Sequence, residues 1–126
     1  MKNLFTYTKR NNDDIYLDVI SVLLVETDPI QAQVLRHQLW SDGYYVRTAS
    51  SPEAAERLSR ELLFDVVIMG ERGFPRLTNF LRGEQLLPSL VLTTSGRQPL
   101  WPHLALPKPY SRHQFREALR QILCQQ

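Results

Sequence analysis

The chain has 126 residues, of which 43% are hydrophobic and 22% charged, and a formal net charge of +2. This composition fits one ordinary domain, and its 15 lysines and arginines are scattered among 13 acids, so charge alone does not indicate a nucleic-acid partner. The single cysteine, Cys124, excludes an internal disulfide and a thiolate metal site, and no apolar run approaches the ~20 residues of a membrane span. With no secretion signal either, we expect a cytoplasmic protein or a cytoplasmic part of a larger one.

Residues 1–18 mix polar residues with isolated apolar ones and show neither helical nor strand periodicity. We expect them to form an N-terminal extension or linker, followed by a single domain over residues 19–126. The segment holds several large apolar residues, so both a docked and a loose arrangement stay open.

From Val19 onward, apolar strands alternate with amphipathic helices. We expect strands over residues 19–25, 44–49, 65–70, 89–94 and 103–107, and helices over 29–41, 50–63, 76–87 and 111–126. Asp28, Ser51 and Ser111 are suited to cap three of these helices, because their side-chain oxygens accept the free N–H groups of a first turn. Val34, Leu35 and Leu39 are expected to face the core from the first helix. The alternation predicts an α/β fold with a parallel sheet covered on both faces.

Functional groups in such sheets gather at the carboxyl ends of the strands. The residues there are Glu26-Thr27-Asp28, Gly70-Glu71, Thr93-Thr94-Ser95 and Lys108-Pro109. Together with the motifs VETDP, FDVVIMG and LPKPY, their order resembles the receiver domain of bacterial two-component response regulators. The resemblance runs from about Val19 to the C-terminus and implies a flavodoxin-like, five-stranded parallel sheet.

In that family an acidic pair binds Mg²⁺, an aspartate at the end of the third strand accepts a phosphoryl group from a histidine kinase, and a threonine or serine and a lysine complete the site. The resemblance places Glu26 and Thr27 at the acidic pair, Gly70 at the phosphoacceptor, Thr93 at the switch position and Lys108 at the lysine. Glycine offers no nucleophile, and one remaining carboxylate loses most of the attraction for Mg²⁺. We therefore expect a vestigial site with no catalytic residue, no metal and no cofactor.

The interval between the last two strands departs from the family as well. Gly96, Pro99 and Pro102 fall within seven residues, and each proline removes a hydrogen-bond donor and restricts the residue before it. The fourth helix of the family is expected to be missing or much reduced. Trp101 in this interval is then either an exposed contact residue or a cover for the core that the helix leaves bare.

A candidate interaction surface combines this interval with the last helix: Leu100, Trp101, Tyr110, Arg112 and Arg116. The arginines recur at helical spacing with Arg120, which would suit nucleic acid, but a solvated outer face is the commoner explanation. Nucleic-acid binding is therefore not expected.

The leading hypothesis is an atypical, phosphorylation-independent pseudo-receiver that acts by protein–protein contact in bacterial signal transduction. Its expected partner is a histidine kinase, a regulator, other domains of the same chain or a second copy. The alternative is regulation by a small ligand or anion in a pocket over Gly70, with Lys108 binding the anion; against it stands an ion pair of Lys108 with Glu26. A weaker alternative is the N-terminal regulatory domain of a DNA-binding regulator. An enzyme is not expected.

Overall fold

The structure is a computed structural model that describes residues 7–10, 16–70, 87–93 and 103–124. Within these ranges the elements are β1 (Tyr7–Arg10), β2 (Tyr16–Val19), β3 (Ser21–Val25), α1 (Pro29–Ser41), β4 (Tyr45–Ala49), α2 (Pro52–Glu61), β5 (Val66–Gly70), β6 (Ser89–Thr93), β7 (His103–Pro107) and α4 (Arg112–Cys124). The helix expected over residues 76–87 and the proline-rich interval with Trp101 lie outside the described residues.

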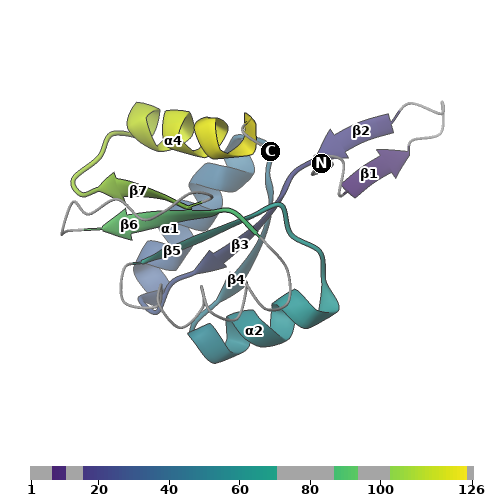
Figure 1. Cartoon of the computed structure of the whole chain (residues 1–126), viewed down its shortest axis with the longest axis horizontal. Coiled ribbons are helices and arrows are strands. Elements are labelled where there is room, and N and C mark those ends of the chain that lie inside the picture. Colours follow the sequence, from purple (N-terminus) through teal and green to yellow (C-terminus); the bar gives the residue numbers. More distant parts are fainter. Residues whose placement is uncertain (1–6, 11–15, 71–86, 94–102, 125–126) are drawn as a thin grey trace.

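Five strands form one parallel sheet in the order β4-β3-β5-β6-β7. This is the flavodoxin-like order that the sequence predicts, with the first strand of the domain next to its second and third. Helices α1 and α4 cover one face of the sheet and α2 lies on the other (Figure 1). The fold class is therefore confirmed.

The central strands are buried on both faces. All five residues of β3 are buried, and so are all five of β6. Alternate residues of β3 join different clusters: Val22 and Leu24 pack with α1 and α4, whereas Leu23 and Val25 pack with α2. Continuous apolar runs are what a parallel sheet with helices on both sides requires.

The expected helix caps are present. Asp28 Oδ1 accepts the N–H of Ile30, and Ser51 Oγ accepts the N–H of Ala54. At the start of α4, Ser111 Oγ accepts the N–H of Gln114, whose Oε1 accepts the N–H of Ser111 in return. Each exchange satisfies backbone donors that a helix cannot pair internally.

One residue that the sequence predicts in the core is exposed in the structure. Val34 is 55% exposed, whereas Leu35 and Leu39 are buried as expected. Successive helical residues are turned by about 100° from each other, so a helix that faces the sheet with Leu35 and Leu39 turns Val34 toward solvent.

The N-terminal segment has more structure than its sequence indicates. β1 and β2 form a separate antiparallel pair, from Tyr7 opposite Val19 to Arg10 opposite Tyr16, and this pair projects away from the main sheet (Figure 1). The sequence shows no strand periodicity here because strands of four residues are too short to display a period-two pattern. The domain boundary at residues 18 and 19 stays a prediction. Of the helices described, none combines the length and apolar character needed to cross a bilayer.

A buried carboxylate ties β3 to the start of β5, and it supplies a stability test. Asp65 Oδ2 accepts the N–H of Ser21 at 2.8 Å, while the hydroxyl of Ser21 is buried and has no hydrogen-bond partner among the described residues. We predict that Asp65→Ala lowers the free energy of unfolding by about 1–3 kcal/mol, because it leaves the buried N–H of Ser21 without its hydrogen-bond acceptor. Ser21→Ala should leave that free energy unchanged or raise it. Urea unfolding of both variants checks this, and an equal loss in both would contradict it.

Candidate functional site

The parallel register brings four of the predicted site residues to one edge of the sheet. Glu26 directly follows β3, Gly70 ends β5, Thr93 ends β6 and Lys108 directly follows β7. Gly70 is opposite Leu92, and Thr93 is opposite Pro107. The carboxyl ends that the sequence singles out therefore meet in space.

Gly70 is not explained by its backbone or its surroundings. Its φ lies outside the left-handed region that favours glycine, in contrast to Gly43, whose φ is 95° where the chain leaves α1. A Cβ built on Gly70 would meet no atom of the described residues within 4 Å. The part of the fold that is described would therefore accept a side chain at this position.

The acidic residues after β3 are engaged in local hydrogen bonds. Glu26 Oε2 accepts the N–H of Asp28 at 3.0 Å, and Asp28 Oδ1 accepts the N–H of Ile30 at 3.0 Å. Thr27 between them is exposed. Both carboxylates thus shape the turn and cap α1.

This donor set does not fit Mg²⁺ as the family binds it. Mg²⁺ requires several oxygen ligands, and of the vestigial residues only Glu26 carries a carboxylate, which already accepts a backbone N–H. Across the described ranges, no three histidine, cysteine, aspartate or glutamate side chains come together in a way that could hold a metal. Glu71, the next carboxylate along the chain, lies outside those ranges.

Lys108 is joined to the site by its backbone. Its N–H donates to the carbonyl of Thr93 at 2.8 Å, its side chain is exposed, and the Lys108–Pro109 peptide bond is cis. The expected ion pair with Glu26 is not formed among the described residues, since the carboxylate of Glu26 turns back to Asp28. Thr93 is 2% exposed, so its side chain belongs to the buried end of β6.

The expected interaction surface is only partly described. Leu100 and Trp101 lie outside the described residues. Tyr110 is half-buried and stacks on Phe115, with ring centroids 5.7 Å apart. Burial raises the pKa of Tyr110, and the nearby charge of Glu26 raises it further. Tyr110 therefore serves the core at least as much as the surface.

Arg112 and Arg116 both bind Asp42 at the end of α1. Arg116 makes two hydrogen bonds, from Nη2 to Oδ1 at 2.7 Å and from Nε to Oδ2 at 3.0 Å, and Arg112 Nη2 lies 3.3 Å from Oδ1. The hydrogen bond from Arg116 is the main cause that holds the pKa of Asp42 below its ordinary value. Burial opposes this effect and raises the pKa, while the positive charges of Arg116 and Arg112 lower it further. Sequence reasoning missed Asp42, because nothing in the sequence links the end of α1 to a helix 70 residues later.

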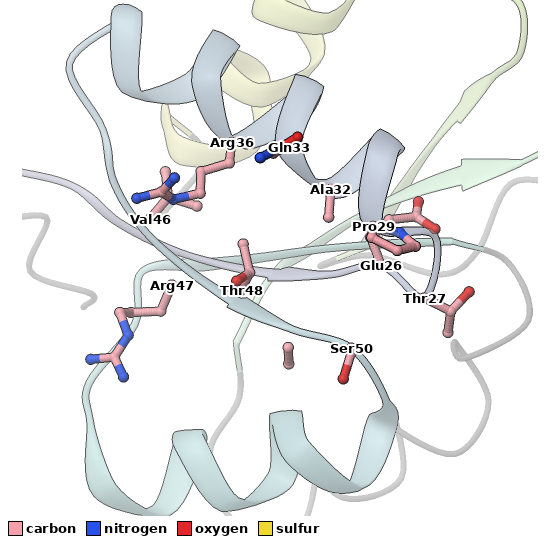
Figure 2. Close-up of a pocket in the computed structure, with 11 residues that line it drawn as sticks. Glu26, Thr27, Pro29, Ala32, Gln33, Arg36, Val46, Arg47, Thr48 and Ser50 are labelled. Atoms are coloured by element: carbon pink, nitrogen blue, oxygen red, sulfur yellow. The ribbon is translucent and has the colours of Figure 1, made fainter.

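The two larger hollows formed by described residues flank the sheet, and neither was expected from the sequence. One of about 600 Å³ lies along β4 beneath α1 and includes Glu26 and Thr27, but Gly70 does not line it (Figure 2). The other, of about 700 Å³, lies between β7 and α4. Both therefore follow the two edge strands of the sheet.

No protein-family model and no curated protein matches the sequence. Solved structures do match along most of the chain. The chemotaxis protein CheY4 of Vibrio cholerae is 24% identical with a TM-score of 0.70, covering 83% of this chain and 99% of that one. A response regulator receiver protein from Sinorhizobium medicae is 18% identical with a TM-score of 0.73, covering 85% and 96%.

The chain has the receiver fold. A third receiver-fold structure, the response regulator TrrA from Thermotoga maritima in complex with Mg²⁺ and beryllium fluoride, is 20% identical with a TM-score of 0.72 and covers 83% of this chain and 100% of that one. At these identities the likeness concerns the receiver fold alone.

The Asp42 contacts give a pH-dependent prediction. The folded-state pKa of Asp42 is depressed, so its stabilisation is full above the unfolded value, near 3.8, and is lost as pH falls through the folded pKa. We predict that Asp42→Asn lowers the melting temperature at pH 7 and that this deficit becomes smaller as pH falls below about 3.8 toward 2. Thermal unfolding across this range checks it, and a deficit of equal size at both ends would contradict the account. Glu117→Gln, which leaves Asp42 untouched, is the control.

Proposed function

We propose that this chain is a pseudo-receiver: a domain of the receiver fold that accepts no phosphoryl group and acts by protein–protein contact in bacterial signal transduction. The observation that carries the proposal is Gly70 at the carboxyl end of β5. Neither backbone conformation nor the space among described residues calls for glycine there. The side chain that receivers use as the nucleophile is therefore absent at a position that would accept one.

The surrounding groups support the same conclusion. By the resemblance, a receiver accepts a phosphoryl group on a carboxylate and uses a cation to neutralise the transferred charge. Glu26 is the one carboxylate among the vestigial residues, and its hydrogen bond to the N–H of Asp28 uses one of its oxygens. Lys108 would remain as a positive charge with no transferred group to neutralise.

The side of the domain formed by β7 and α4 offers a surface for contact with a partner protein. β7 has one neighbour in the sheet, and the hollow between it and α4 combines buried Ala105 and Leu106 with exposed polar residues of the helix. By the resemblance, receivers use this side of the domain to meet partners. A histidine kinase, a regulator, other domains of the same chain or a second copy are the partner classes we propose.

The two alternatives have less support. The hollow that includes Glu26 extends toward β4 instead of over Gly70, so it does not form the anion pocket that a ligand-regulated domain would need. Arg112 and Arg116, the basic residues that would suit DNA, are held by Asp42. We accordingly propose neither a small-ligand sensor nor a nucleic-acid contact, and no enzymatic reaction.

Incubation with acetyl phosphate and Mg²⁺ tests the proposal, with the intact mass as the measurement. We predict that the chain gains no phosphoryl mass. The double variant Thr27→Asp/Gly70→Asp should gain one acid-stable, base-labile phosphoryl group, because it restores the nucleophile and a second metal-binding carboxylate.

The matched control is Thr27→Asn/Gly70→Asn, which has nearly the same shape but offers no carboxylate and should stay unmodified. A phosphoryl adduct on the unaltered chain would overturn the proposal. Failure of the aspartate variant to react would show that Gly70 and Thr27 do not account for the loss.

A further inference from the structure

The outer edge of β4 carries backbone groups that no described strand pairs. β4 has β3 as its one neighbour, and the N–H of Tyr45 and the carbonyl of Ala49 both point to that side, toward Ile20 and Glu26. Backbone groups alternate in direction along a strand paired in parallel. Val46 and Thr48 therefore direct their N–H and C=O groups outward, as an edge strand does.

This edge forms the floor of the 600 Å³ hollow. Figure 2 shows Arg36 and Gln33 extending from α1 over one side of β4, while Arg47 extends from the other side of the strand. Thr48 lies between them, on the side of α1. A chain laid along this edge would therefore pass between two guanidinium groups.

The edge is basic in its middle. Arg36 and Arg47 are exposed, and neither forms an ion pair or a hydrogen bond with another residue that the structure describes. The acidic lining residue is Glu26, which lies at the far end and bonds to the N–H of Asp28. A partner with carboxylates would complement this charge.

The opposite end of β4 is aromatic. Trp40 is 71% exposed and Tyr45 41% exposed, and both line a smaller hollow of about 180 Å³ with Val19 and Tyr44. Exposed tryptophan and tyrosine are frequent anchors of protein contacts. The hollow is suited to one large apolar side chain.

We propose that the outer edge of β4 binds an extended, acidic segment of a partner protein by strand addition. The backbone of Val46 and Thr48 supplies the hydrogen bonds, Arg36 and Arg47 bind the carboxylates, and an apolar side chain of the segment packs on Trp40 and Tyr45. Strand addition through a sheet edge uses main-chain bonds for affinity and side chains for choice of partner.

A second copy of this chain is the less suitable occupant. Two-fold pairing of β4 with itself would bring Arg36 and Arg47 of both copies to one shared edge, where like charges oppose each other. The proposal does not depend on whether Gly70 replaces a phosphoacceptor, so the two can fail separately.

The test uses the full chain labelled with ¹⁵N and a blocked seven-residue peptide with valine at both ends and in the middle and two adjacent glutamates on each side of the middle valine. Adjacent strand residues point to opposite faces, so this peptide offers carboxylates to both Arg36 and Arg47. We expect the amide signals of Val46 and Thr48 to shift on titration. A matched peptide with lysine in place of glutamate should bind at least about tenfold more weakly, because it sets like charges against the two arginines.

Variants of this chain distinguish the contribution of the backbone hydrogen bonds to binding from that of the two arginines. Thr48→Pro removes an outward N–H at a position where an edge strand tolerates proline, and it should abolish binding. Thr48→Val keeps the N–H and should bind normally, which guards against a fold defect in the proline variant. Arg36→Gln and Arg47→Gln should each weaken binding about three- to tenfold, whereas Arg57→Gln on α2 should not.

Four outcomes would overturn the proposal. Equal binding of the two peptides would exclude charge recognition, and shifts confined to amides away from β4 would place the site elsewhere. A dimer in sedimentation that Thr48→Pro dissociates would assign the edge to a second copy. The absence of any shift at millimolar peptide would also contradict it.

Discussion

The burial of β3, β5 and β6 on both faces is the constraint from which the rest of the structure follows. Every residue of β3 and β6 is buried, as are the first four of β5. Each fully buried valine, leucine or isoleucine side chain contributes about 1.5–3 kcal/mol, so both faces must be covered by helices. Helical crossover connections over both faces make the strands parallel, and parallel strands bring their carboxyl ends to one end of the sheet.

The sequence was sufficient to predict the buried strands and the helices that cover them. The apolar runs located the central strands, and the Asp28-Pro29 and Ser51-Pro52 pairs located two helix starts. It was insufficient at the N-terminal segment, where the β1–β2 pair is too short to show a period. The edge strand β4 was predicted within one residue of its bounds, although it mixes exposed and buried residues.

The candidate site, too, could be predicted from the sequence only in part. Glu26, Gly70, Thr93 and Lys108 were found because their positions follow from strand ends, which local pattern determines. The link of Arg112 and Arg116 to Asp42 and the hollow along β4 were not found, since each depends on segments brought together only by the fold. Distant polar contacts leave no periodic trace in a sequence.

Gly43 and Gly70 differ in whether the backbone requires a glycine at their position. Gly43 has a positive φ that few other residues adopt, so its glycine serves the backbone. Gly70 has no such conformation, so the backbone does not require glycine there, and under the proposed function its lack of a side chain concerns the chemistry of the strand end. A domain altered in this way keeps its edges and helix faces as surfaces for partners, which is why we place function there.

NMR of the labelled chain with Mg²⁺ and beryllium fluoride, a mimic of the phosphoryl group, tests the central claim most directly. We predict that the amide signals of Glu26, Gly70 and Thr93 do not move, since under the proposed function the strand ends offer neither an acceptor nor a sufficient set of metal ligands. Saturable shifts centred on these three amides would contradict it.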